Sequence, residues 1–116
     1  MYKYKVKIDR IVDGDTIDVV VDLGFKITTH QRIRLEGINT PETYNVKKNS
    51  EEYKKGMEAK NFVIGRIEAN NYEAIIETEK YTGKFGRYIG TVWLADSSVS
   101  LNDELVNKGY AKVAHY

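Results

Sequence analysis

The chain has 116 residues, of which 41% are hydrophobic and 30% charged, as in an ordinary globular protein. Its 18 basic and 17 acidic residues give a net charge of only +1, so any nucleic-acid binding must depend on a local cluster of charge. The absence of cysteine excludes disulfides, thiolate zinc sites, iron–sulfur clusters and a cysteine nucleophile.

The N-terminal part of the chain predicts β-strands. Apolar and polar residues alternate over residues 4–8 and again over 16–23, which is the period-two pattern of half-buried strands. The Asp-Gly-Asp run at 13–15 separates the two and predicts a tight turn. A third strand is expected over residues 28–38. We expect its two faces to carry Ile33 and Leu35 on one side and Arg32, Arg34 and Glu36 on the other.

The hydrophobic period then changes to that of a helix. Turn formers and two lysines over 43–49 predict an exposed loop. Asn49 or Ser50 can cap a helix that runs to about Asn70, and Glu52 stands three residues after Asn49, as in a capping box. The apolar residues at mostly helical spacing are Met57, Ala59, Phe62, Val63 and Ile67.

Two further strands and a short helix complete the expected elements. The strands cover residues 73–79 and 87–95, with a loop over 80–86 between them. Ser100 and Asp103 open a second helix that continues through Val106, and Gly109 stands where a C-terminal cap is expected.

The order β-β-β-α-β-β predicts a β-rich α+β fold. A small five-stranded Greek-key barrel, with the long helix inserted after the third strand, suits this order; an open sheet that carries one helix is the alternative. The length predicts one domain, residues 1–116. No apolar run approaches the roughly 18 residues of a membrane helix, so we expect no membrane partner.

The first segment with the residue types for chemistry is Asp13-Gly14-Asp15-Thr16. Two carboxylates on either side of a glycine are held close together, and carboxylate oxygens are the natural ligands of Ca²⁺ or Mg²⁺. Aspartate and glycine are also ordinary turn formers. From these four residues alone, a structural turn and a metal site both stay open.

A second segment joins an arginine inside a strand to a carboxylate after a turn. Arg34 precedes the run Thr40-Pro41-Glu42, in which Pro41 restricts the backbone on both sides. The proline therefore holds the Thr40 carbonyl and Glu42 in a defined relation. A solvated strand face that ends in a proline turn is the simpler interpretation.

The third segment, Gly83-Lys84-Phe85-Gly86-Arg87, places two cations and a ring between two glycines. Cations suit phosphates and a ring suits base stacking, although a plain hairpin loop would have the same composition. The segment lacks the spacing of a P-loop or of a dinucleotide-binding motif.

Together, and in this order, the three segments make the chain resemble the thermonuclease family, the staphylococcal nuclease-like enzymes. Almost the whole chain is covered. The matching residues are Asp13-Gly14-Asp15-Thr16, Arg34 with Thr40-Pro41-Glu42-Thr43, Gly56-Met57-Glu58-Ala59, Lys84-Phe85-Gly86-Arg87, and Gly109 with Ala111-Lys112-Val113-Ala114.

The resemblance implies a five-stranded OB-fold barrel that cleaves DNA and RNA as an endonuclease with Ca²⁺. It implies that Asp15 and the Thr40 carbonyl are metal ligands. Asp13 would contribute through a bound water, with a purely structural turn role left open. By the same resemblance, Arg34 and Arg87 would hold the scissile phosphate, and Glu42 would orient or deprotonate the attacking water.

The chain departs from the family pattern at the metal site. Asn39 stands where the family usually has aspartate, so a neutral carbonyl oxygen replaces an anionic ligand and we expect weaker binding of divalent ions. Glu36 on the same strand could compensate, but we favour its pairing with Arg32 or Arg34 or its exposure to solvent.

The nucleic-acid contacts depart as well. Phe85 replaces the usual tyrosine, and His115 stands in place of a base-stacking tyrosine near the end of the family pattern. Lys84 remains a candidate phosphate contact, or an exposed loop lysine without a role. We expect Lys47 and Lys48 to belong to a solvated loop.

Two other functions compete with a nuclease. One is a non-catalytic OB-fold module that binds nucleic acid or protein, and the other is a protein-interaction barrel in which Asp13 and Asp15 only form a turn. The presence of Arg34, Glu42 and Arg87 favours the enzyme. We expect a monomer. The N-terminus lacks the apolar core of a secretory signal, so the default location is the cytoplasm, although a secreted mature form or a phage-encoded protein would also fit.

Overall fold

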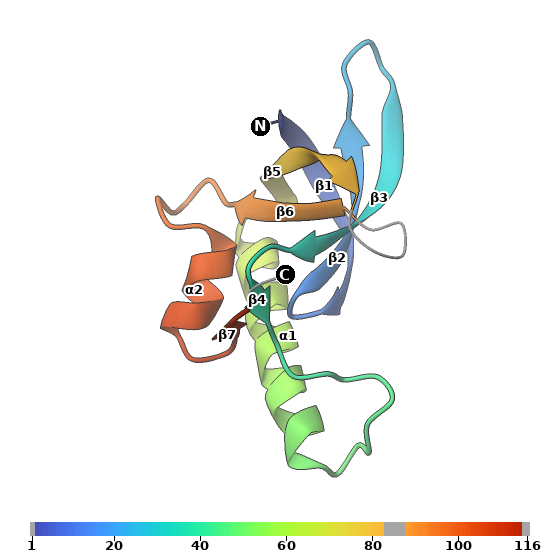
Figure 1. Ribbon diagram of the computed structural model, residues 1–116. Helices are drawn as coiled ribbons and strands as arrows, with labels where there is room; N and C mark the ends of the chain where they lie inside the picture. The colour runs from blue at the N-terminus through green and yellow to red at the C-terminus, as the bar shows by residue number, and fades with distance from the viewer. Residues whose placement is uncertain (1, 83–87, 115–116) are drawn as a thin grey trace.

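The computed structural model describes residues 2–82 and 88–114, except for the side chains of 79–82. The elements follow one another along the chain from the N-terminus to the C-terminus (Figure 1). They are β1 (Tyr2–Asp13), β2 (Thr16–Asp22), β3 (Thr28–Leu35), β4 (Ile38–Asn39), α1 (Glu51–Ala69), β5 (Glu73–Thr82), β6 (Tyr88–Trp93), α2 (Leu101–Asn107) and β7 (Lys112–Val113).

Five of the strands close into a barrel in the order β1-β2-β3-β6-β5. The neighbours in this barrel are antiparallel except for β3 and β6, which pair in parallel, with Arg34 opposite Ile89. This mixed barrel with two helices is the OB-type fold that the resemblance implies. The Greek-key barrel is therefore confirmed, and the open sheet is wrong.

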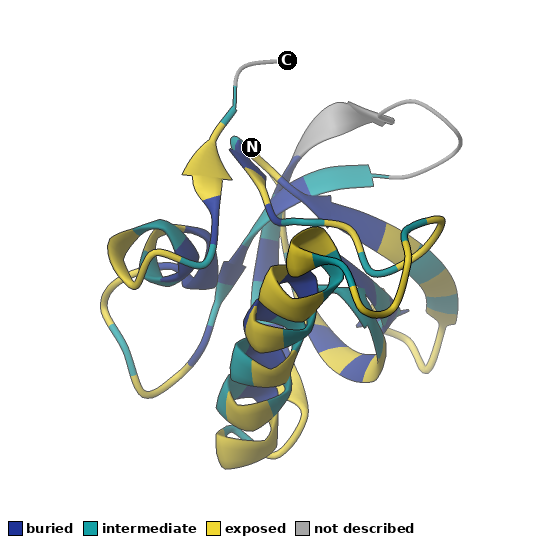
Figure 2. Cartoon of the chain, turned by 90° about the horizontal axis from the view of Figure 1, so that it is seen from below, coloured by how far each residue is buried: buried dark blue, intermediate teal, exposed yellow. Residues whose placement is uncertain are grey.

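The core fills the inside of the barrel and the space beneath α1, where buried and exposed residues alternate along the strands (Figure 2). In β1, Val6 and Ile8 are buried while Lys5 and Lys7 are exposed, as the period-two pattern predicts. The largest fully buried side chains are Ile17, Val19, Leu35, Val63, Ile67, Ile76, Val92, Leu101 and Leu105.

Helix α1 begins after Ser50, whose side chain accepts a hydrogen bond from the Tyr53 backbone N–H. Because Ser50 is the cap, Glu52 lies one position too early for the predicted capping box, which does not form. The buried positions Gly56, Ala59, Val63 and Ile67 form one face of the helix, whereas Met57 and Phe62 are only half-buried. In the described residues, no helix has the length and apolar character needed to cross a membrane.

The predicted third strand was too long. The barrel strand β3 ends at Leu35, and Gly37 has a φ of 77° that turns the chain out of the barrel. Ile38 and Asn39 then form β4, which pairs with β7 in a separate two-stranded sheet. A period-two pattern continues through such a turn, so the alternation alone could not show the break.

Near the C-terminal end, the boundaries also differ slightly from the expectation. Strand β5 continues to Thr82, beyond the predicted end at residue 79, and β6 begins at Tyr88. The Ser100 side chain caps α2 by accepting from the Asp103 N–H, and Gly109 follows the helix with a φ of 83°. The predicted caps of the second helix are thus confirmed.

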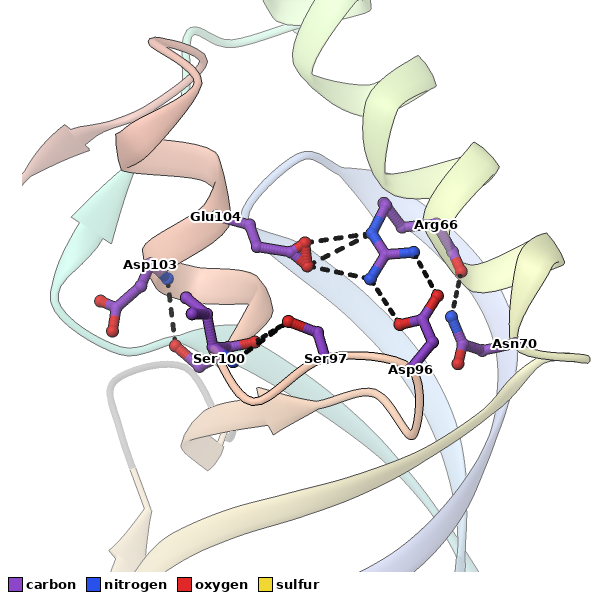
Figure 3. Close-up of polar contacts among 8 residues, drawn as sticks. Arg66, Asn70, Asp96, Ser97, Ser100, Asp103 and Glu104 are labelled. Carbon is purple, nitrogen blue, oxygen red and sulfur yellow. Dashed lines mark hydrogen bonds and ion pairs between the residues drawn. The ribbon is translucent and has the colours of Figure 1, made fainter.

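An ion-pair network ties α1 to the loop after β6 and to α2 (Figure 3). The Arg66 guanidinium donates to both carboxylate oxygens of Asp96, at 2.7 Å each. It also donates to the Glu104 carboxylate at 3.0–3.2 Å. The hydrogen bonds from Arg66 lower the pKa of Asp96 to about 2.

This network predicts a loss of stability at low pH. The folded pKa of Asp96 lies below its ordinary value of 3.8, so the ionised carboxylate stabilises the fold above pH 3.8, and this contribution is lost as the pH falls toward 2. Asp96→Asn should therefore lower the free energy of unfolding at neutral pH, with a difference from the wild type that shrinks between about pH 4 and 2. Urea unfolding over this pH range measures it. Asp9→Asn, an exposed aspartate on β1, is the control, and parallel curves for the wild type and Asp96→Asn would contradict the prediction.

Candidate active site

Three segments meet beside α1: the turn between β1 and β2, the end of β3, and the chain after β4. A methyl group on Gly14 would lie 2.9 Å from both the Ala59 Cβ and the Thr40 Cγ2. A methyl group on Gly56 would lie 2.7 Å from the Pro41 carbonyl oxygen. Both positions therefore need glycine, and the close packing fixes Thr40 and Pro41 between the turn and the helix.

Asp15 is the buried carboxylate of this arrangement, with 8% of the residue exposed. One of its oxygens accepts from the Thr16 hydroxyl at 3.0 Å, and the other accepts from the Thr40 backbone N–H at 3.1 Å. The predicted turn is confirmed, and it also places Asp15 directly against the segment that carries Thr40.

Arg34 is buried rather than exposed on the outer face of β3. Its Nη2 lies 3.2 Å from the Asp15 carboxylate and also donates to the side-chain oxygen of Asn39. Its Nη1 donates to the Leu35 carbonyl at 3.1 Å. Charge-assisted hydrogen bonds of this kind hold a guanidinium in one orientation. The structure thus brings Asp15, Arg34, Asn39 and Thr40 together, as the sequence predicted.

Asp13 lies on the same turn and accepts a hydrogen bond from the Thr43 hydroxyl. Burial raises the pKa of Asp13, and the negative charge of Asp15 raises it further, against the lowering effect of the Thr43 hydrogen bond. Two carboxylates that repel each other in this way favour a nearby positive charge.

Glu42 follows directly after the fixed Pro41 and is exposed. Its backbone N–H lies 3.5 Å from a carboxylate oxygen of Glu52 at the start of α1. Because it is exposed, the Glu42 carboxylate is accessible to water and to a substrate from the solvent side. Glu36 is exposed, which is one of the two outcomes that the sequence favoured, while Arg32 pairs with Asp18 at 2.7 Å.

Part of the predicted site lies outside the described residues. These positions are Lys84, Phe85 and Arg87 in the predicted phosphate-contact loop, and His115 near the C-terminus. Their assignments therefore stay predictions.

The oxygen donors present fit a hard divalent cation. Asp13 and Asp15 supply carboxylates, and Asn39 and the Thr40 carbonyl supply neutral oxygens, which is the donor chemistry that Ca²⁺ accepts. The Thr40 Oγ1 is buried without a hydrogen-bond partner, a further sign of polar groups that the described residues alone do not satisfy. No three acidic or histidine residues cluster among the described residues, so the anionic part of this donor set is small.

Two threonines that shape the site had no role predicted from the sequence. Thr16 and Thr43 orient the two aspartates through their hydroxyls. Both belong to the motifs that carry the resemblance, so the motif was the available signal. The contact between Thr43 and Asp13 joins positions 30 residues apart, and no local pattern could have shown it.

The described residues thus form a closed OB-type barrel with a buried Asp15–Arg34 pair at the β1–β2 turn. The family model described as staphylococcal nuclease homologue matches residues 32–116, and the chain belongs to this family.

Individual relatives extend the match to the N-terminal strands. Thermonuclease of Staphylococcus intermedius is 35% identical over 97% of this chain and 60% of that protein. Thermonuclease of Staphylococcus hyicus is 33% identical over 95% of this chain and 59% of that protein. Endonuclease YhcR of Bacillus subtilis is 29% identical over 94% of this chain but only 9% of its own length. The chain thus spans about three fifths of the curated thermonucleases that it matches.

Proposed function

We propose that this protein is a metal-dependent nuclease that hydrolyses phosphodiester bonds of DNA, RNA or both. The observation that carries the proposal is the contact between Arg34 and Asp15 at 3.2 Å, with the Thr40 N–H on the same carboxylate. In a chain of the staphylococcal nuclease homologue family, this contact joins one proposed metal ligand to one proposed phosphate contact.

The reaction sets clear demands on such a site. A phosphodiester is anionic and repels a hydroxide, and negative charge builds on its oxygens as water attacks. We assign Asp15, the Thr40 carbonyl and Asn39 as the residues that would hold a cation, most suitably Ca²⁺, with Asp13 contributing through a water. When bound, such an ion offsets charge and polarises the phosphate.

The two arginines meet the charge of the phosphate. A guanidinium stays charged at any working pH and can donate two parallel hydrogen bonds to phosphate oxygens. Arg34 is held in place by the Leu35 carbonyl and Asn39, so it is oriented before a substrate arrives. Arg87 is proposed as its partner.

Glu42 is proposed to orient or deprotonate the attacking water. Its carboxylate is exposed next to the fixed Pro41, where a water can lie between it and a phosphate held by Arg34. Lys84, Phe85 and His115 are proposed as nucleic-acid contacts. The proposed working unit is one domain, residues 1–116, acting as a monomer.

The test is cleavage of a single-stranded DNA and a single-stranded RNA oligonucleotide with Ca²⁺, resolved by gel. We expect internal cleavage that stops on addition of EDTA and returns with excess Ca²⁺. Tight binding of either strand without cleavage under any divalent ion would refute the enzyme and favour a non-catalytic binding module.

The amide at position 39 gives a separate prediction. Asn39→Asp restores an anionic oxygen next to Asp15, so it should tighten Ca²⁺ binding, on the order of tenfold. Isothermal titration calorimetry measures the affinity. Asn107→Asp, an exposed position on α2, is the control for added charge. An unchanged affinity in Asn39→Asp would show that position 39 does not face the ion.

A further inference from the structure

Beside the proposed site, an aromatic ring and two cations come together from three separate elements. Tyr44 lies on the loop between β4 and α1, with 43% of the residue exposed. The Arg10 Nη2 on β1 lies 3.3 Å from the Tyr44 hydroxyl, to which it donates. The Lys60 ammonium on α1 lies 5.9 Å from the centre of the Tyr44 ring.

Neither Arg10 nor Lys60 forms an ion pair within the described part of the chain, although the charge of Lys60 acts on Asp13 and lowers its pKa. Asp18 is the carboxylate across the strand pair from Arg10, but both of its oxygens accept from Arg32, at 2.7 and 3.1 Å. The pKa of Asp18 is lowered chiefly by the Arg32 hydrogen bond, and the charge of Arg10 contributes less. The cluster therefore keeps positive charge available to a ligand.

The fold fixes this cluster next to the site. Thr43, the residue before Tyr44, donates to the Asp13 carboxylate. Helix α1 packs closely against the same segment, because any side chain at Gly56 would collide with the Pro41 carbonyl oxygen. The pairing of β1 with β2 has a register irregularity between Ile8 and Arg10. Irregularities of this kind, such as β-bulges, change the local strand geometry and can redirect a side chain.

An exposed ring between cations is the chemistry that binds single-stranded nucleic acid. Bases stack on aromatic side chains, and the adjoining phosphates bind lysine and arginine. Because every base has a π-face, such a contact tolerates any sequence. A nuclease that acts on a strand needs contacts of this kind beside the bond it cleaves.

We propose that Tyr44, Arg10 and Lys60 form a nucleotide subsite that extends the active site toward α1. A base of single-stranded nucleic acid stacks on the Tyr44 ring, and the adjoining phosphates contact Arg10 and Lys60. This subsite rests on the proposed function, because that function supplies the strand. The subsite strengthens binding of a strand that passes the scissile position.

The test measures binding rather than cleavage. Glu42→Gln protein is titrated with fluorescein-labelled decamers of thymidylate and of uridylate in Ca²⁺, and binding is followed by fluorescence anisotropy. In this background, Tyr44→Ala should weaken binding about tenfold, and Tyr44→Phe, which keeps the ring, should lose less. Arg10→Gln and Lys60→Gln should each lower the slope of log affinity against log salt by about 0.7.

Matched controls come from the same chain. Tyr2→Ala removes an equally exposed tyrosine on β1, and Lys54→Gln removes an exposed lysine on α1. Equal affinities for Tyr44→Ala and Tyr2→Ala, or no binding by the background protein, would overturn the subsite. If wild-type protein cleaves while the Tyr44, Arg10 and Lys60 variants bind normally, the nuclease stands and the subsite fails. If those variants lose binding while wild-type protein does not cleave, the subsite stands and the nuclease fails.

Discussion

Glu42→Gln will lower the rate of cleavage of single-stranded DNA or RNA by a factor on the order of a hundred to ten thousand. The amide keeps the size of the side chain but cannot accept a proton from water, and general-base catalysis contributes about this factor. Because Glu42 is exposed, the exchange removes no buried contact, and the fold should be unaffected. Single-turnover cleavage with saturating Ca²⁺ measures the rate of the chemical step.

The matched control is Glu51→Gln, an exposed glutamate in the first turn of α1. It removes the same charge near the site without touching the proposed water, so its rate should stay close to that of the wild type. A Glu42→Gln protein that cleaves as fast as Glu51→Gln would show that Glu42 neither orients nor deprotonates the water. The proposed mechanism would then lose its base while the metal and arginine assignments remained testable.

Asn102→Ala will lower the free energy of unfolding by about 2–4 kcal/mol. Asn102 is 4% exposed, and its side chain accepts from the Val92 N–H at 3.0 Å and donates to the Glu36 and Gly90 carbonyls at 3.0 and 3.2 Å. The alanine removes three hydrogen bonds and leaves the Val92 N–H without the Asn102 acceptor, although the Gly90 carbonyl still accepts from the Glu36 N–H at 2.8 Å. Urea denaturation followed by circular dichroism measures the loss.

Two further variants distinguish the loss of hydrogen bonds from the loss of side-chain volume as the cause of the lower stability. Asn107→Ala, at an exposed position of the same helix, should change stability by less than about 0.5 kcal/mol. Asn102→Asp fills the same volume but cannot donate to the two carbonyls, so it should destabilise at least as much as Asn102→Ala. A stable Asn102→Asp protein would mean that volume, not hydrogen bonding, explains the alanine result. Because Glu36 follows Arg34 and Leu35 on the chain, the loss should also loosen the end of β3.

The sequence predicted the barrel because apolar and polar residues alternate along its strands. Val6 and Ile8 are buried and Lys5 and Lys7 exposed, and the helical spacing of Ala59, Val63 and Ile67 predicted the buried face of α1. Local patterns record which side of an element is buried. They do not record where a chain leaves a sheet, which is why the turn at Gly37 and the β4–β7 pair were missed.

The candidate site, too, was predicted from the sequence only in part. The motif order predicted that Asp15, Arg34, Asn39 and Thr40 belong together, and the structure brings them together. The burial of Arg34 was not predictable from its strand, because its contacts include Asp15 at the β1–β2 turn and Asn39 in β4. The contact of Tyr44 with Arg10 spans 34 residues, and only the closed barrel with its helix shows it.

We propose above all that Asp15 helps to hold the cation on which cleavage depends. The measurement that tests it most directly is the rate of cleavage of single-stranded DNA as a function of Ca²⁺ concentration, for the wild type and for Asp15→Asn, with circular dichroism confirming that both are folded. We expect Asp15→Asn to need at least on the order of tenfold more Ca²⁺ than the wild type to reach half of its maximal rate. Cleavage that needs no divalent ion, or the same Ca²⁺ requirement in both proteins, would contradict it.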